Sequence, residues 1–230
     1  MIVIVGFVSQ KGGVGKSTLA RGLAVAAAHA GIKVRIADLD PQQETVAEWE
    51  QRRAAAGISP IVPVVKVTAA TEAISKAQPG DQLLIIDGPA RTSRGTLEIA
   101  RHADLIVQPS GAGYDDLDPA IRLFHELADI GIPRERMVVA LCRIGTDKEE
   151  DFARKYVTKA GYGVLPGSLP EKPLFREAHN RGLAVSEVPH KALKAAVDEL
   201  LNGIFERMAG AMKRKVLAEE PARNKAGSKA

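Results

Sequence analysis

Short β-rich apolar segments alternate with longer segments of helical period along roughly the first two thirds of the chain. The apolar segments predict strands at residues 2–8, 33–37, 61–65, 82–87, 104–108 and 137–142. The periodic segments predict helices at residues 17–30, 43–55, 69–77, 116–130 and 148–160. Such alternation is typical of βαβ units, so we expect an α/β fold with a mostly parallel, twisted sheet and helices on both faces.

The pattern changes after residue 161, where a Pro- and Gly-rich stretch precedes a short helix expected at residues 174–180. A long helix is expected at residues 190–216. The glycines and prolines between these segments are typical of helix ends and do not indicate a domain boundary. We therefore expect one domain at residues 1–217 and a polar, basic, disordered tail at residues 218–230.

Composition and charge indicate a protein with one hydrophobic core and a basic C-terminal end. The chain has 230 residues, of which 45% are hydrophobic, so it can bury one sizeable core. The formal net charge of +4 lies at one end, because residues 203–230 hold seven Lys and Arg against three Glu and the rest is balanced. A basic end attracts polyanions, although it also keeps a protein in solution.

Cysteine and histidine give no metal-ligand spacing, because Cys142 is the single cysteine and the five histidines are scattered. A disulfide framework is excluded. The apolar segment at residues 2–8 is too short to span a membrane and lacks the features of a secretory signal. We expect a cytoplasmic protein.

A phosphate-binding loop is expected at residues 11–18, Lys-Gly-Gly-Val-Gly-Lys-Ser-Thr, between the first expected strand and the first expected helix. Glycines there let backbone N–H groups turn toward a phosphate, and the N-terminus of the following helix adds a positive dipole. Lys16 is expected to span the β- and γ-phosphates, Ser17 to ligate Mg²⁺ and Thr18 to reach the α-phosphate. The remaining cradle residues are Gly12, Gly13, Val14 and Gly15.

Carboxylates follow two of the other expected strands. Asp38 and Asp40 come at the end of the second strand, and their spacing of two points both toward the phosphate loop. Asp87 ends the apolar run at residues 83–86, which is the form of a Walker B strand whose aspartate holds Mg²⁺ through water. An aspartate before a proline is also a common turn opener, so Asp40 alone has a simpler interpretation.

Lys11, which precedes the glycines, distinguishes this loop from an ordinary Walker A motif. With this lysine, residues 11–18 resemble the deviant Walker A motif of the ParA/MinD family of ATPases. The resemblance implies that Lys11 reaches the phosphates of a partner subunit in an ATP-bound homodimer, as an arginine finger does. Residues 38–42, Asp-Leu-Asp-Pro-Gln, resemble the family's switch I. By that resemblance Asp40 positions the attacking water, Asp38 supports the Mg²⁺ shell, and Arg143 lies near the nucleotide base.

Within the family the chain resembles the short, ParF-like ParA partition proteins, since Trp49 and the first strand are placed as in that group. The resemblance implies slow, adaptor-stimulated ATP hydrolysis, a ParB-like adaptor, nonspecific DNA binding and association with the nucleoid, for segregation of plasmid or chromosomal DNA. Clustered basic residues are needed for DNA binding. The candidates are Lys172, Arg176, Arg181, Lys213, Arg214 and Lys215, with Lys191 and Lys194 beside them.

Other functions remain open. A ParA-type ATPase can position a protein cargo, such as a carboxysome or a chemoreceptor cluster. A MinD-like membrane-associated ATPase requires an amphipathic C-terminal helix, and the apolar residues at 204–217 have only part of that spacing, so membrane binding is not expected. An iron protein of the nitrogenase type needs several cluster cysteines, and biotin-pathway enzymes lack the early lysine of the loop.

Overall fold

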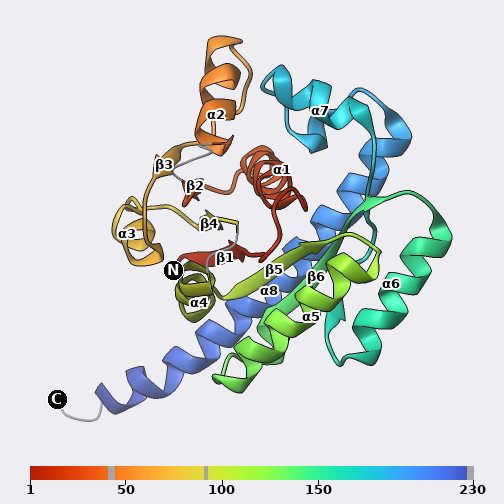
Figure 1. Cartoon of the computed structure of the whole chain (residues 1–230). Coiled ribbons are helices and arrows are strands. Elements are labelled where there is room, and N and C mark those ends of the chain that lie inside the picture. Colours follow the sequence, from red (N-terminus) through yellow and green to blue (C-terminus); the bar gives the residue numbers. More distant parts are fainter. Residues whose placement is uncertain (41–44, 91–92, 227–230) are drawn as a thin grey trace.

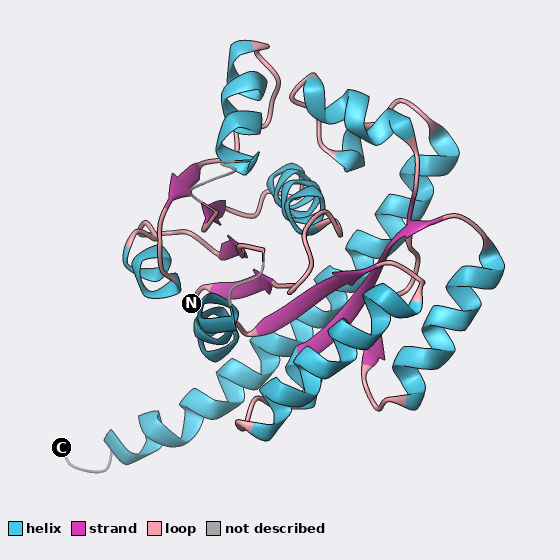
Figure 2. Ribbon diagram, viewed as in Figure 1, coloured by secondary structure: helices cyan, strands magenta, loops and turns pink. Residues whose placement is uncertain are grey.

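The computed structural model describes residues 1–40, 45–90 and 93–226 as an α/β fold around a parallel sheet (Figures 1 and 2). The strands run in the order β3-β2-β4-β1-β5-β6-β7, with β8 paired to β6, and every described pairing is parallel. The strands are β1 (Val3–Phe7), β2 (Val34–Asp38), β3 (Val64–Lys66), β4 (Leu83–Asp87), β5 (Leu105–Ser110), β6 (Met137–Ile144), β7 (Gly163–Val164) and β8 (Leu169–Pro170).

Two hydrophobic layers cover the sheet because alternate strand residues face opposite sides. One layer packs against α1 (Lys16–His29), α2 (Thr45–Ala55), α7 (Pro173–Asn180) and α8 (Lys191–Ala226). The other layer packs against α3 (Ala70–Ser75), α4 (Ser93–His102), α5 (Tyr114–Asp129) and α6 (Asp147–Lys159). Short 3-10 turns, η1 (Arg134–Arg136) and η2 (Val185–Glu187), complete the described elements. The expected fold class is confirmed.

Two helices differ from expectation, and the short strands β7 and β8 lie in the Pro- and Gly-rich stretch where no strand was predicted. Helix α4 was not predicted, because Gly95 and a polar start obscure its pattern, yet Thr96, Ile99 and Ala100 lie on its buried side. Helix α8 continues to Ala226, because the segment after residue 216 is rich in good helix formers. Residues 227–230 of the predicted tail lie outside the described part of the chain. Among the described helices, none is both long and apolar enough to cross a membrane.

The strand register brings the predicted carboxylates together at one edge of the sheet. Asp38 at the end of β2 and Asp87 at the end of β4 are direct partners across the ladder, and Asp87 is also opposite Phe7 at the end of β1. The chain leaves β1 at this point to form the loop before α1. The edge of the sheet therefore combines two carboxylates with the predicted phosphate loop.

A buried ion pair ties α2 to the segment after α7. The Arg53 side chain is fully buried and donates to both carboxylate oxygens of Glu187, at 2.6 and 2.9 Å, and to the carbonyl oxygen of Gly182 at 3.1 Å. Trp49, also fully buried, donates from its indole nitrogen to the carbonyl oxygen of Leu183 at 3.1 Å. Helix α2 is thus fixed to the region of α7 and η2 by polar contacts as well as by packing.

Glu187→Gln is expected to lower the free energy of unfolding by about 3 kcal/mol, because it leaves the buried guanidinium of Arg53 without a counter-charge. Urea denaturation followed by circular dichroism measures the change. The matched control is Glu48→Gln, which removes the exposed pair between Glu48 and Arg52 and is expected to change stability by less than about 0.5 kcal/mol. Equal effects of the two substitutions would refute a stabilising role for the buried pair.

Candidate nucleotide-binding site

The phosphate loop has the backbone geometry that an anion cradle requires. Gly13 and Gly15 have φ angles of 72° and 111°, in the left-handed region that glycine adopts without strain. Helix α1 begins at Lys16, directly after Gly15, so the N–H groups of its first turn face the loop. Val14 is buried under the loop. The predicted cradle at residues 12–18 is therefore built as a turn at a helix N-terminus.

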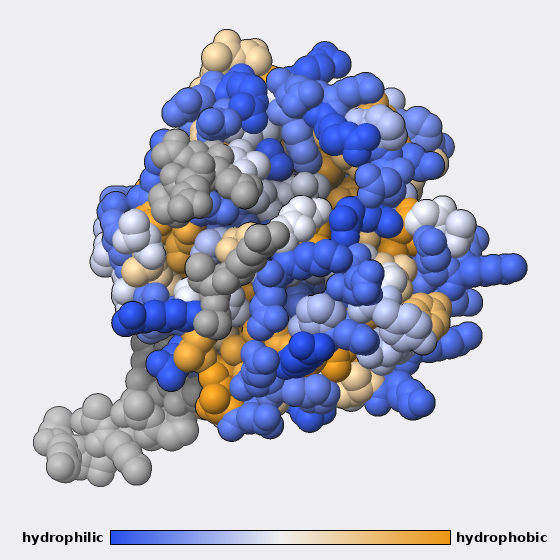
Figure 3. Space-filling model, in the orientation of Figure 1, coloured by the Kyte–Doolittle hydropathy of each residue, from blue (hydrophilic) through white to orange (hydrophobic). Residues whose placement is uncertain are grey.

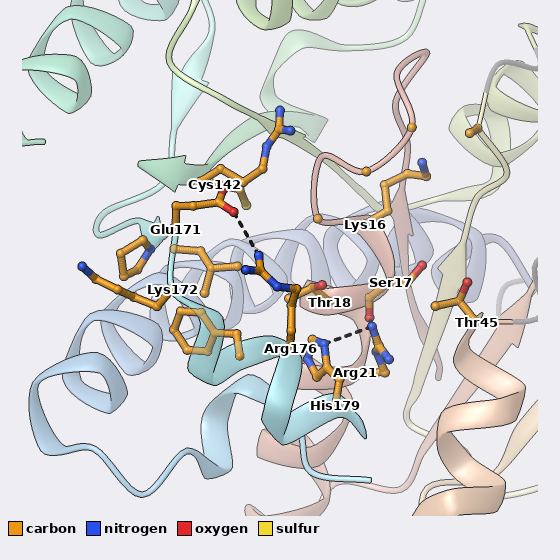
Figure 4. A pocket seen from close by; sticks show the side chains of 18 of the residues that line it. Lys16, Ser17, Thr18, Arg21, Thr45, Cys142, Glu171, Lys172, Arg176 and His179 are labelled. Atoms are coloured by element: carbon orange, nitrogen blue, oxygen red, sulfur yellow. Dashed lines mark hydrogen bonds and ion pairs between the residues drawn. The ribbon is translucent and has the colours of Figure 1, made fainter. Parts of the chain in front are cut away.

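A pocket opens above this cradle. Its walls come from the loop, the end of β2, the start of α2, the end of β6, β8 and the start of α7 (Figure 4). The lining residues outside the loop include Arg21, Asp40, Thr45, Gly88, Ala90, Cys142, Arg143, Leu169, Pro170, Glu171, Lys172, Phe175, Arg176 and His179. The pocket thus joins segments that are far apart in sequence, with the phosphate cradle along one side.

Asp87 has the environment of a magnesium-binding carboxylate. It is buried, and one of its oxygens, Oδ1, has no hydrogen-bond partner. The pKa of Asp87 is raised to about 7, chiefly by burial and also by the charge of Asp38, against the opposing effects of the hydrogen bond from Ser17 and the charges of Lys16 and Arg21. Within the described ranges, no group of three or more His, Cys, Asp or Glu side chains gathers to hold a metal ion. The buried Asp87 oxygen without a hydrogen-bond partner, on a carboxylate that Ser17 contacts, fits Mg²⁺, which binds through one or two protein oxygens together with substrate phosphates.

Asp38 organises the segment that follows β2. Its Oδ1 accepts a hydrogen bond from the backbone N–H of Asp40 at 3.0 Å, and its Oδ2 accepts from the N–H groups of Val46 and Ala47 at 3.1 and 3.2 Å. Both oxygens thus bind backbone groups, two of them in the first turn of α2. A part for Asp38 in the Mg²⁺ shell stays a prediction. Pro41 and Gln42 of the predicted switch I lie outside the described residues.

Lys16 points into the pocket as predicted, and it is buried. Burial lowers its pKa, while the negative charges of Asp87 and Asp40 raise it. Asp40 is half-buried and lines the same pocket. The predicted lysine and the predicted water-positioning carboxylate therefore lie at one site.

Lys11 turns away from its own pocket. Its ammonium Nζ lies 2.5 Å from Asp116 Oδ1, and it also donates to the carbonyl oxygen of Asp115 at 3.4 Å, both at the start of α5. Arg143, which has a φ of 57°, donates to the other oxygen of Asp116 at 2.9 Å. Asp116 therefore holds two of the three cations that were predicted to contact nucleotide, namely Lys11 and Arg143.

Arg21 and His179 belong to the site, although the sequence did not indicate them. Arg21 donates to the carbonyl oxygen of Ser17 at 2.9 Å, lies 5.8 Å from the centre of the Trp49 ring and lies beside His179, at 3.5 Å (Figure 4). Burial lowers the pKa of Arg21 to about 10, and the charges of Asp87 and Asp38 oppose that change. Its charge thus partly balances the carboxylates. These contacts join α1, α2 and α7, which no single sequence motif predicts.

His179 makes stability depend on pH. Burial, with the charges of Arg21 and Arg52, lowers its pKa to about 3. Because this folded-state pKa lies below the ordinary value of 6.5, the unfolded chain binds more protons between the two values, and the fold loses stability as the pH falls. The loss is expected to reach about 2 kcal/mol between pH 6.5 and pH 5.

Urea denaturation of the wild type and of His179→Gln at both pH values measures this loss, which the substitution is expected to reduce. The exposed His102→Gln serves as control and is expected to retain the wild-type dependence. An unchanged pH dependence in His179→Gln would show that other groups cause it.

The predicted DNA-binding residues are dispersed. Lys172 and Arg176 line the nucleotide pocket, where Arg176 contacts Glu171 at 3.3 Å (Figure 4). Lys215 lies 2.7 Å from Asp104 Oδ2 and donates to the carbonyl oxygen of Ile2 at 2.9 Å, so it holds α8 against the sheet. Arg181, Lys213 and Arg214 are exposed.

Comparison with known proteins identifies a family of nucleotide-binding domains. The sequence family described as "CobQ/CobB/MinD/ParA nucleotide binding domain" matches residues 5–185. The iron-sulfur cluster carrier protein of Aquifex aeolicus (strain VF5) is 26% identical over 252 aligned positions, which cover 89% of this chain and 68% of that protein.

Two solved structures share the fold. The cell division ATPase MinD of Pyrococcus furiosus matches with a TM-score of 0.71 and 20% identity, over 90% of this chain and 99% of that one. The septum site-determining protein MinD of Pyrococcus horikoshii OT3, complexed with Mg-ADP, matches with a TM-score of 0.70 and 19% identity, over 89% and 96%.

Proposed function

The chain belongs to the CobQ/CobB/MinD/ParA nucleotide binding domain family, and we propose that it is a ParA-type partition ATPase, which dimerises on ATP and binds DNA nonspecifically. ATP and Mg²⁺ are its cofactors, as the sequence predicted. Hydrolysis is slow, is stimulated by an adaptor protein and releases the DNA. The cargo is a plasmid or a chromosomal region, and the protein associates with the nucleoid.

One observation carries the proposal, namely the different directions of the two loop lysines. Lys16 is buried inside the pocket, whereas the Lys11 side chain is 44% exposed and points away from the pocket toward α5. A lysine outside its own pocket can reach the phosphates of a second subunit once its ion pair with Asp116 opens. This arrangement supports hydrolysis that depends on dimerisation.

The chemistry uses residues that lie around the cradle. Backbone N–H groups and Lys16 bind the β- and γ-phosphates. Ser17 and Asp87 would hold Mg²⁺, which when bound would supply positive charge beside those phosphates. Asp40 orients the attacking water, and Asp38 positions Asp40 through the hydrogen bond to its backbone. Lys11 of the partner subunit stabilises the charge that develops on the transferred phosphoryl group.

DNA binding is proposed for exposed basic side chains that dimerisation would double. Lys213 and Arg214 on α8 and Arg181 after α7 are exposed, and the positive charge of the chain lies in the same C-terminal region. Lys172 and Arg176 would act nearer the nucleotide, because they line its pocket. Lys215 is the weakest candidate, since its ammonium already contacts Asp104.

A MinD-like membrane role is the second candidate, because Met212, Val216 and Leu217 are exposed on α8 among basic residues. ParA-type positioning of a protein cargo is compatible with the same site. Iron–sulfur cluster transfer, suggested by the name of the Aquifex relative, finds little support, because the chain has one cysteine and Cys142 is buried with its pKa raised to about 12.

DNA binding measured by fluorescence anisotropy tests the proposal. Purified protein is titrated onto labelled duplex DNA with ATP and Mg²⁺, with ADP, or without nucleotide, at about 50 mM and about 200 mM salt. Binding is expected only with ATP and is expected to weaken steeply at the higher salt. Absence of DNA binding in every nucleotide state, together with ATP-dependent binding to liposomes, would replace the partition function with the MinD-like one.

A further inference from the structure

Three aromatic side chains form a cluster on the surface between α5 and α6. Tyr114 is 59% exposed and Phe152 is 38% exposed, and their ring centroids lie 5.1 Å apart in an edge-to-face arrangement. Tyr156 completes the cluster, with its ring 5.7 Å from Tyr114 and 6.1 Å from Phe152. The Tyr156 hydroxyl donates to the carboxylate of Asp118. The rings are therefore held in place by contacts with one another.

This cluster is unusual for the molecule. The chain has only five Phe, three Tyr and one Trp, and most of the surface seen in Figure 3 is hydrophilic with small hydrophobic areas. Aromatic residues fixed in place and exposed to solvent are typical of protein interfaces, since they contribute large contact area at a low entropic cost. The three rings thus indicate a contact surface.

A pocket of about 300 Å³ adjoins the start of α5 and of α6. It is lined by Gly111, Ala112, Gly113, Asp116, Arg143, Glu149 and Glu171. Three of these side chains are carboxylates: Asp116 is paired with Arg143, Glu171 is paired with Arg176, and Glu149 accepts hydrogen bonds from the backbone N–H groups of Gly145 and Thr146. A cationic side chain that enters this pocket therefore competes with these partners for the carboxylates.

The surroundings are acidic, although the chain as a whole is basic. Residues 111–118, 143, 147–156 and 171 carry eight carboxylates and four basic side chains, in a chain of net charge +4. Arg154 is paired with Glu150 and Arg143 with Asp116. Lys11 and Arg176, which lie outside these ranges, pair with Asp116 and Glu171, so six basic side chains face the eight carboxylates. Charge complementarity therefore favours a basic partner.

We propose that Tyr114, Phe152, Tyr156 and the adjoining carboxylate pocket form a docking surface for a short basic and apolar segment of a partner protein. The apolar side chains of the segment cover the rings, and an arginine or lysine enters the pocket. Cation–π contact with the rings adds to the attraction of the carboxylates. The inference rests on the proposed function only in identifying this partner with the adaptor.

Docking is coupled to Lys11 through Asp116. Asp116 lines the pocket and also holds the Lys11 ammonium at 2.5 Å. A cation that enters the pocket competes with Lys11 for this carboxylate. Occupation of the surface therefore favours release of Lys11 from α5 and makes it available to nucleotide.

Fluorescence anisotropy with a short labelled peptide of repeating Leu-Arg-Gly-Lys tests the surface, without nucleotide and without DNA. The wild type is compared with the double variant Tyr114→Ser, Phe152→Ser, and the control is Ile61→Ser, Ile130→Ser, which removes exposed apolar residues elsewhere. The dissociation constant is expected to rise about tenfold in the aromatic variant and to stay unchanged in the control. Matched Leu-Glu-Gly-Glu and Gly-Arg-Gly-Lys peptides are expected to bind more weakly than the probe.

Three results would overturn the inference. The wild type does not bind the peptide, the aromatic variant binds it as tightly as the wild type does, or the wild type binds the acidic peptide more tightly than the basic probe. Sedimentation of both proteins is measured in parallel. A nucleotide-free wild-type dimer that becomes a monomer in the aromatic variant would assign the surface to a second copy of the chain and would also overturn it. Since DNA and ATP are absent from the assay, its outcome is independent of the partition function.

Discussion

Lys16→Ala is expected to reduce ATP turnover by about 100-fold or more and to weaken ATP binding, because this lysine is the charge of the cradle that lies inside the pocket. Steady-state release of phosphate and titration with a fluorescent ATP analogue measure the two effects. Lys33→Ala, at an exposed lysine outside the site, is the matched control and is expected to retain wild-type values.

Because Lys16 is buried between the charges of Asp87 and Asp40, its removal also affects the fold locally. Circular dichroism and urea denaturation of the variant establish that it remains folded. Wild-type turnover in a folded Lys16→Ala protein would contradict the assignment of the pocket. Lys16→Arg, which keeps the charge in a larger group, separates loss of charge from loss of fit.

Lys11→Ala is expected to reduce ATP turnover by about 100-fold or more while leaving binding of ADP unchanged, because Lys11 lies outside its own pocket and is proposed to act on the partner's nucleotide. Stability is expected to change little, since the side chain is 44% exposed. The matched variant is Asp116→Asn, which removes the ion pair and retains the lysine. Its turnover is expected to equal or exceed that of the wild type.

Mixing separates action in trans from action in cis. Equal amounts of Lys11→Ala and Lys16→Ala are combined, so that a mixed dimer holds one nucleotide in an intact pocket facing an intact Lys11. Turnover is expected to recover in part relative to either variant alone. Recovery in the absence of any dimer, or full activity of Lys11→Ala by itself, would refute the proposed role of this lysine.

The phosphate cradle and its carboxylates were predictable from the sequence because they lie on consecutive residues or at strand ends. Asp38 and Asp87 meet because parallel strands end at one edge of the sheet, and the register pairs them directly. Successive side chains of β1 and β4 are buried in opposite hydrophobic layers, as expected for central strands of a sheet that is covered on both faces. These features depend on local patterns, which a single sequence contains.

Contacts between distant segments were not predictable. Arg21 and His179 meet only because α7 lies against α1, and Lys215 contacts Asp104 only because α8 passes the starts of β1 and β5. The apolar spacing of α4, which buries Thr96, Ile99 and Ala100, was present in the sequence and was obscured by the polar residues around it. Long-range packing therefore decided which basic residues are exposed to solvent and which are held in ion pairs.

The structure connects the nucleotide pocket with the C-terminal region. Asp38 binds the first turn of α2 through Val46 and Ala47, and α2 is fixed to the segment around η2 through Trp49 and Arg53. Hydrogen bonds therefore link the end of β2, through α2, to the segment around η2.

The molar mass of Asp40→Ala, measured by light scattering with ATP and Mg²⁺, with ADP and Mg²⁺, and with ATP and a chelator, tests the proposed ATP-dependent dimer most directly. The substitution is expected to block hydrolysis, so the ATP state persists during the measurement. A dimer is expected with ATP and Mg²⁺, and a monomer is expected in the other two conditions. A monomer in all three conditions, or a dimer in all three, would contradict the proposed ATP-dependent dimer.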